Sequence, residues 1–191
     1  MRVEHEEKKQ ISVGRRQLVL AGVGMMTAGV AAASDSAAKV ETATTGKIPM
    51  VLPQTEFVYE AIVDVASSVD LGMGPLGQRR MVPILGGTFE GRGLRGKVLP
   101  NGGMDRQLVR KDGVKRLDAL YEMQTEDGAI LTVRNQVVID DGVTPRYAFS
   151  AIDITAPDGP YAWLNRIQLV GTLNSLRPER NAVVIRAFKL V

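Results

Sequence analysis

The chain has 191 residues, with 24 Lys or Arg against 21 Asp or Glu and a formal net charge of +3. It contains no Cys, which excludes disulfides, thiolate nucleophiles and sulfur-ligated metals. Its single imidazole is that of His5.

The N-terminal residues have the pattern of an export signal. A polar stretch ends in Arg15 and Arg16, about sixteen small or apolar residues follow, and alanines precede Ser34 where a signal peptidase requires small side chains. The pattern predicts a twin-arginine signal over residues 1–33, cleaved near Ala33-Ser34, with export by the twin-arginine machinery to the periplasm or the medium. An uncleaved anchor and an ordinary cytosolic tail are the alternatives.

Removal of this segment would lower the net charge and remove the single His, so fewer kinds of catalytic and binding site would be possible. Residues 1–33 carry five Lys or Arg and three Glu, so the net charge falls from +3 to +1. We expect no binding of nucleic acid and no stable membrane anchor, because the remaining domain has no basic cluster. Without His, a Ser-His-Asp triad is excluded, and we expect neither a metal site nor a cofactor. Catalysis would have to use carboxylates, Tyr, Lys, Arg or amides.

The folded domain is expected over residues 54–191, after a flexible lead-in over residues 34–53 that is rich in Ala, Thr, Ser and Lys. Over residues 56–65 the side chains alternate, which places Phe57 and Tyr59 on the apolar face of a half-buried strand. Tyr59 is therefore a candidate for ligand binding in the interior, the alternative being a core tyrosine with a satisfied hydroxyl.

Short apolar or alternating runs follow at close intervals, separated by turn signals such as Gly-Gly, Pro-Asn-Gly and Asp-Gly. They cover residues 81–85, 94–99, 105–110, 115–124, 129–140, 146–154, 161–171 and 182–190. No segment has a sustained 3.6-residue period, so helices are not expected. We predict an all-β fold, a single closed antiparallel β-barrel of about 8–10 strands, because an open sheet would leave long edges exposed.

One stretch matches a nucleotide-binding motif only formally. Gly91-Arg-Gly-Leu-Arg-Gly96 has the form G-x-G-x-x-G, which in dinucleotide-binding proteins joins a strand to a helix. Lys-Val-Leu-Pro-Asn-Gly-Gly follows and cannot begin a helix. We therefore interpret the stretch as a β-hairpin.

The alternation also directs polar side chains into the barrel. Placing the neighbouring arginines in solvent turns Asp105 and Gln107 inward, and the apolar faces of the next two strands include Tyr121 and Asn135. A buried carboxyl has a raised pKa and suits acid-base chemistry, so Asp105 and Tyr121 are the catalytic candidates, and Gln107 and Asn135 are candidates for ligand binding. In the alternative, Asp105 caps the turn at Asn101 or pairs with an arginine, and Tyr121 only packs in the core.

Three further candidates follow a Pro-Asp-Gly-Pro turn. On a strand, Tyr161, Trp163 and Asn165 share one face, where two aromatic rings would wall a ligand and the amide would orient it. The alternative is that Trp163 plugs one end of the barrel. Arg80 is a candidate for bidentate binding of an acidic ligand, the alternative being a solvated pair with Arg79.

Several motifs occur together in one order: Gly77-Gln-Arg-Arg80, Pro83-Ile-Leu-Gly-Gly-Thr-Phe-Glu-Gly91, Gly102-Gly-Met-Asp-Arg-Gln107, Asp127-Gly-Ala129, and Tyr161-Ala-Trp-Leu-Asn165 followed by Val170-Gly171. In this combination the chain resembles the uncharacterised domain-of-unknown-function family 3237 over residues 57–191. The resemblance implies a compact β-barrel with a lipocalin-like or cyclase-like outline and supplies no established catalytic residues. Many members of that family look cytosolic, so the export signal is a departure.

These observations predict an exported β-barrel that binds one small organic molecule, aromatic or acidic, in its interior. A second hypothesis is a cofactor-independent lyase or isomerase, in which Asp105 is the acid-base group and Tyr121 or Tyr161 is the proton donor. The amides of Gln107, Asn135 and Asn165 would then hold a developing oxyanion. A third is a structural or interaction barrel with a solid core, for which a homodimer is one form.

Overall fold

The structure is a computed structural model that describes residues 50–191, so the expected export signal and most of the expected lead-in lie outside the described residues. The strands of the described part are β1 (Thr55–Val65), β2 (Val69–Gly74), β3 (Gly77–Gly91), β4 (Leu94–Val98), β5 (Met104–Arg110), β6 (Lys115–Thr125), β7 (Ile130–Asp140), β8 (Tyr147–Thr155), β9 (Leu169–Ser175) and β10 (Ala182–Leu190). A short 3-10 helix, η1 (Ala162–Arg166), precedes β9. No helix among residues 50–191 is long and apolar enough to cross a membrane.

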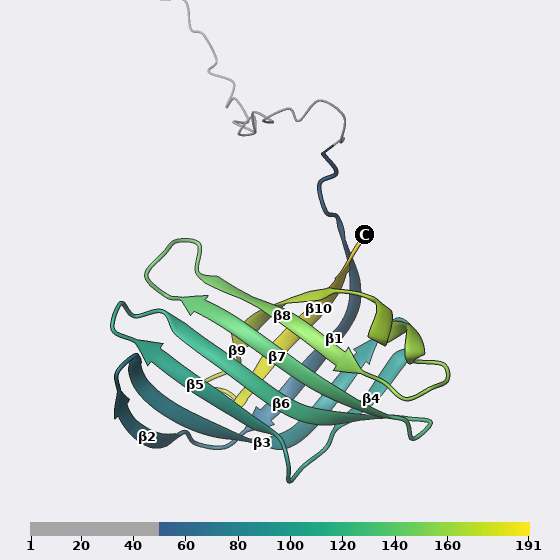
Figure 1. Cartoon of the computed structure of the whole chain (residues 1–191). Coiled ribbons are helices and arrows are strands. Elements are labelled where there is room, and N and C mark those ends of the chain that lie inside the picture. The colour runs from purple at the N-terminus through teal and green to yellow at the C-terminus, as the bar shows by residue number, and fades with distance from the viewer. Residues whose placement is uncertain (1–49) are drawn as a thin grey trace, which may run out of the picture. The chain divides into compact units, whose positions relative to one another are not determined.

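The strands form one antiparallel sheet that closes on itself through the pairing of β1 with β3 (Figure 1). The long strand β3 is shared by four partners, with β2 and β1 following one another along one side of it and β5 and β4 along the other. The ten strands of the described part therefore occupy eight positions around the barrel. This confirms the prediction of a single closed antiparallel β-barrel.

The closure between β1 and β3 depends on glycine. Gly87 has φ +140°, and a Cβ atom there would lie 2.0 Å from the carbonyl oxygen of Ile62. At Gly91 the corresponding distance to the carbonyl oxygen of Val58 is 1.9 Å. Only a residue without a side chain permits this approach of the two backbones. The same Gly91 pairs with Leu94 in the β3–β4 hairpin, so the G-x-G-x-x-G stretch is a hairpin, as predicted.

The interior is formed by side chains that alternate along each strand. On β6 and β7 every residue that the sequence directed inward is buried. The prediction for β1 was wrong at one point, since a bulge between Phe57 and Tyr59 turns Val58 into the core and leaves Phe57 43% exposed. Such an extra residue reverses the alternation on one side of it.

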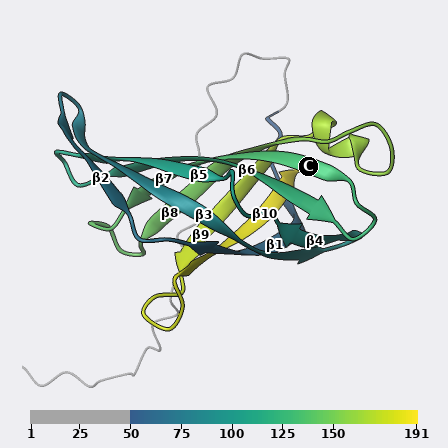
Figure 2. The ribbon, with the colours of Figure 1, turned by 90° about the horizontal axis from the view of Figure 1, so that it is seen from below.

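The two ends of the barrel differ. In Figures 1 and 2 the segment η1 lies at one end and the β2–β3 hairpin at the other. Leu164 of η1 is buried in the core, and the hydroxyl of Tyr161 donates to Asp127 Oδ1 at 3.0 Å, in the turn after β6. The prediction of a strand over residues 161–171 was therefore wrong, because a 3-10 turn follows Pro160 and the strand begins only at Leu169.

Candidate functional site

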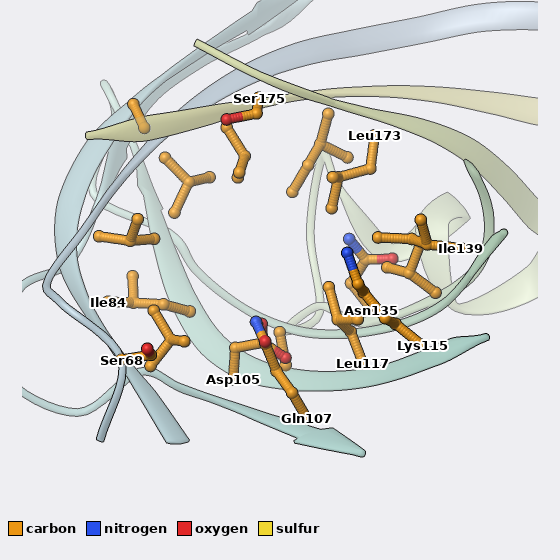
Figure 3. Close-up of a pocket in the computed structure, with 18 of the residues that line it drawn as sticks. Ser68, Ile84, Asp105, Gln107, Lys115, Leu117, Asn135, Ile139, Leu173 and Ser175 are labelled. Atoms are coloured by element: carbon orange, nitrogen blue, oxygen red, sulfur yellow. The ribbon is translucent and has the colours of Figure 1, made fainter. Parts of the chain in front are cut away.

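A cavity of about 280 Å³ opens at the end of the barrel opposite η1 (Figure 3). Exposure falls steadily along the inward face of β6, from 39% for the side chain of Lys115 to 9% for Leu117 and 1% for Tyr121. The mouth of the cavity thus lies at the start of β6, and its floor lies near Tyr121. The barrel is not filled by its own side chains at this end, in contrast to the solid core considered above.

Polar residues form part of the wall near the floor. Asp105, Ala119 and Asn135 are direct neighbours in one row across β5, β6 and β7, and all three line the cavity. Figure 3 shows the side chains of Asp105, Gln107 and Asn135 directed into the hollow. Because Ala119 between them has only a methyl group, the space over it is open to a group that reaches both polar side chains.

Asp105 is held by an amide rather than by a cation. Gln107 Nε2 donates to Asp105 Oδ2 at 2.6 Å, while Asp105 Oδ1 has no partner within residues 50–191. Burial raises the pKa of the Asp105 carboxyl, and the hydrogen bond from Gln107 opposes that shift without cancelling it. The protonated acid therefore persists to higher pH than in an exposed carboxyl, and Oδ1 is a buried oxygen without a hydrogen bond in the described residues.

Four more buried polar atoms lack a partner in the described part of the chain. They are Asn135 Oδ1, the hydroxyls of Tyr121 and Tyr59, and Ser150 Oγ. Burial raises the pKa of both tyrosines, so their hydroxyls stay protonated and can donate. Buried polar groups in proteins are normally hydrogen-bonded, so such a concentration of unpartnered oxygens needs an explanation.

The mouth is basic. Arg80, Lys115, Arg146 and Arg177 line the cavity, whereas Asp105 is the one acidic residue among the lining residues of the described chain. Lys115 and Arg146 are both bound to Asp141, each at 2.7 Å.

The other two basic residues, Arg80 and Arg177, are not bound to a carboxylate of the described residues. Arg80 donates only to the neutral amide oxygen of Gln78, at 2.7 Å, and within residues 50–191 neither it nor Arg177 forms an ion pair. The mouth therefore presents guanidinium groups with free donors.

The structure brings together five of the residues singled out by the sequence. Asp105, Gln107, Tyr121, Asn135 and Arg80 all line the cavity. Within residues 50–191, Asp105 neither caps the turn at Asn101 nor pairs with an arginine. Sequence reasoning missed Lys115, Arg146 and Arg177. Lys115 continues the inward alternation of β6 by one step, which is a signal that would have found it.

The remaining candidates lie elsewhere. Tyr59 is fully buried but does not line the cavity. Tyr161, Trp163 and Asn165 are carried by the η1 segment, and none of them lines the cavity either. The amide of Asn165 is used locally, accepting from the backbone N–H of Ala156 and donating to its carbonyl, each at 2.9 Å. The expected shared face of these three residues does not form, because they do not lie on a strand.

Sequence comparison places a "UPF0311 protein" of Rhodopseudomonas palustris (strain TIE-1) among the relatives, with 41% identity over 85 residues. These residues are 43% of this chain and 53% of the relative, so the chain spans about half the length of the relatives that it matches by sequence.

Solved structures resemble the whole barrel. A conserved protein of unknown function from Rhodopseudomonas palustris has a TM-score of 0.67 and 27% identity, covering 74% of this chain and all of that one. A "beta-barrel like protein" from Acinetobacter baumannii has a TM-score of 0.66 and 29% identity, covering 75% and 99%. The family model "Protein of unknown function (DUF3237)" matches residues 53–190, and the chain therefore belongs to this family of uncharacterised β-barrel proteins.

Proposed function

We propose that the barrel binds one small organic molecule, acidic or aromatic, in the interior cavity that β1, β3, β5, β6, β7, β9 and β10 surround. The observation that supports this proposal is that three residues lining one cavity, Asp105, Tyr121 and Asn135, each carry a buried oxygen without a hydrogen-bond partner in the described residues. An unsatisfied buried polar group costs about 1–3 kcal/mol, so an interior that keeps several of them is adapted to a partner that satisfies them.

Size and charge agree with such a ligand. A volume of about 280 Å³ lies near the lower end of the range of small-molecule pockets and suits roughly ten to fifteen non-hydrogen atoms. The walls combine apolar residues such as Val82, Leu117 and Val137 with a few polar groups, which is the usual make-up of a ligand site. The basic mouth attracts an acidic molecule.

The test is native mass spectrometry of the protein as purified from the organism that produces it, compared with the same sample after denaturation. We expect an additional non-covalent mass of a few hundred daltons at most, as the cavity volume requires. The matched control is Ala119→Leu, which fills the space between Asp105 and Asn135 and should remove the additional mass while circular dichroism shows the barrel intact. A bare mass for the wild-type protein, together with no binding of small acidic or aromatic probes, would contradict the proposal.

A second candidate function is a cofactor-independent lyase or isomerase reaction in the same cavity. The raised pKa of Asp105 and its free oxygen favour this candidate, because an acid with one unbonded oxygen can exchange a proton with a bound molecule. Tyr121 would donate a proton, and Gln107 and Asn135 would hold a developing negative charge. Asp105→Asn should abolish turnover and change the dissociation constant of the ligand only a few-fold. Loss of binding together with turnover would assign Asp105 to ligand binding alone.

Export is a separate part of the proposal. The twin-arginine pattern at Arg15 and Arg16 supports delivery to the periplasm, with Ser34 as the first residue of the exported form. N-terminal sequencing of the protein from a periplasmic fraction tests this directly. Substitution of both arginines by lysine should retain the protein in the cytoplasm, and a periplasmic product from that variant would contradict the assignment.

A further inference from the structure

The cavity has a chemical polarity along its depth. Basic residues are found at the mouth, and near the floor the unpartnered atoms are the oxygens of Asp105, Tyr121 and Asn135. Resting on the proposed function, we infer that the ligand is a small hydroxy-carboxylate, bound with its carboxylate at the mouth on Arg80 and Arg177 and its hydroxyl at the floor between Asp105 and Asn135.

The mouth selects for the carboxylate. A guanidinium with free donors binds a carboxylate through two parallel hydrogen bonds, which an ammonium cannot reproduce. Lys115 and Arg146 are already bound to Asp141, so among the described residues Arg80 and Arg177 are the basic groups of the cavity without an ion-pair partner. Both line the cavity, Arg80 from β3 and Arg177 from the segment after β9.

The floor selects against a second carboxylate. Asn135 Oδ1 is an acceptor without a hydrogen-bond partner in the described residues, and a carboxylate has no proton to donate to it. A hydroxyl satisfies both neighbours, since it donates to Asn135 Oδ1 and accepts from the protonated Asp105 or from the Tyr121 hydroxyl. An ammonium in this position would need a charged Asp105, which the burial of that carboxyl disfavours.

The spacing of the two ends fixes the length of the ligand. Arg80 pairs across the sheet with Gln107, which lies two residues nearer the mouth than Asp105. Two residues of an antiparallel strand correspond to roughly 7 Å. A single aromatic ring or a short alkyl chain with an acid at one end and a hydroxyl at the other spans this distance and fits the cavity volume.

The experiment uses a panel built on one such molecule, with titration calorimetry on the full chain. The first probe is 4-hydroxyphenylacetate. Phenylacetate lacks the hydroxyl, 4-hydroxyphenylacetamide lacks the charge, tyramine reverses the charge, and 4-(aminomethyl)phenylacetate carries a CH2NH3+ group in place of the hydroxyl. We expect 4-hydroxyphenylacetate to bind at least about tenfold more tightly than each of the four analogues, in line with the loss of one charge-assisted or buried hydrogen bond.

Substitutions in the protein test which residues bind the carboxylate end of the ligand and which bind the hydroxyl end. Arg80→Gln and Arg177→Gln should weaken binding of the acid at least about fivefold without affecting the amide, since only the acid uses the charge. Asn135→Leu should weaken binding of 4-hydroxyphenylacetate but not of phenylacetate. The matched control is Arg95→Gln, which removes an exposed guanidinium paired with Glu90 outside the cavity and should change no affinity.

The results distinguish a wrong ligand class from a wrong proposed function. Equal affinity for the acid and the amide, or tightest binding of either amine, overturns the hydroxy-carboxylate inference and leaves a ligand-binding barrel standing. If no probe binds, the molecule found by native mass spectrometry decides, and one without both a carboxylate and a hydroxyl overturns the inference. Absence of binding by every probe together with a bare native mass contradicts the proposed function itself.

Discussion

Asp105 and Gln107 lie two residues apart on the inward face of β5, joined by a 2.6 Å hydrogen bond from the amide to one carboxyl oxygen. The amide fixes the orientation of the carboxyl but supplies no positive charge to neutralise it. Elsewhere on the barrel, carboxylates such as Asp64 and Asp118 are bound by two nitrogens of one arginine. Asp105 is therefore fixed in position, while its carboxyl is not neutralised by a cation.

The stability of the protein should respond to pH through Asp105. Burial raises the pKa of this carboxyl above its usual 3.8, so charging it is harder in the folded state than in the unfolded one. The folded state therefore loses stability as the pH rises from about 4 through the raised pKa, and the loss is complete above it. Asp105→Asn cannot charge and should not show this loss. Urea unfolding at several pH values measures the difference in stability between the two proteins, which should grow as the pH rises from about 4 and level off above the raised pKa.

For Asp141, which provides the control, we expect the opposite change of stability with pH. Lys115 and Arg146 lower the pKa of its carboxyl, so the stability that it contributes is present above the unfolded-state pKa and lost as the pH falls. Asp141→Asn should therefore lose stability mainly at neutral pH. If the free energies of unfolding of wild type and Asp105→Asn change in parallel at all pH values, burial does not raise the pKa of Asp105.

Two amides on the barrel should respond in opposite directions to the same substitution. Asn135 is 1% exposed with an unpartnered Oδ1, so Asn135→Leu removes an unsatisfied group and should leave stability unchanged or raise it by about 1 kcal/mol. Asn165→Leu breaks the two bonds to the backbone of Ala156 and should lower stability by about 1 kcal/mol. Thermal and chemical unfolding of both variants measures this. A large loss for Asn135→Leu would mean that its amide stabilises the fold rather than serving a ligand.

Closure of the barrel should fail when a side chain is placed at Gly87. A Cβ atom there would approach the Ile62 carbonyl oxygen to 2.0 Å, and the φ of +140° is unfavourable for any other residue. Gly87→Ala should cost more than about 3 kcal/mol or prevent folding. Gly93→Ala, in the β3–β4 turn at φ +66° with open space around it, should cost only about 1–2 kcal/mol. Similar losses for the two variants would exclude close backbone approach as the reason for Gly87.

The sequence predicted the barrel and the inward faces of β5, β6 and β7. The alternating pattern of a half-buried strand shows that the segment is a strand and also which of its faces points inward. It did not predict β2, whose residues are exposed or half-exposed, since a strand with neither face in the core leaves no alternating pattern. It also misassigned residues 161–171, where a run that begins Tyr-Ala-Trp-Leu fits a 3-10 turn as well as a strand.

The site was predicted only in part for a related reason. Asp105, Gln107, Tyr121 and Asn135 lie within alternating strands, so their direction could be inferred. Arg146 and Arg177 lie outside the strands, and their position at the mouth depends on the course of the chain around β8 and β9. No local pattern encodes that course.

The fluorescence of Trp163 should not report on the cavity. Trp163 is the only tryptophan of the chain, is 38% exposed, and belongs to η1 at the opposite end of the barrel. Addition of 4-hydroxyphenylacetate at saturating concentration should therefore leave its emission unchanged, and Trp163→Phe should leave the affinity unchanged. The control is Leu117→Trp in the Trp163→Phe background, which places an indole in the cavity wall and should respond to the same probe. Quenching of Trp163 without a response from the Leu117→Trp reporter would move the ligand to the η1 end, next to Tyr161 and Asn165.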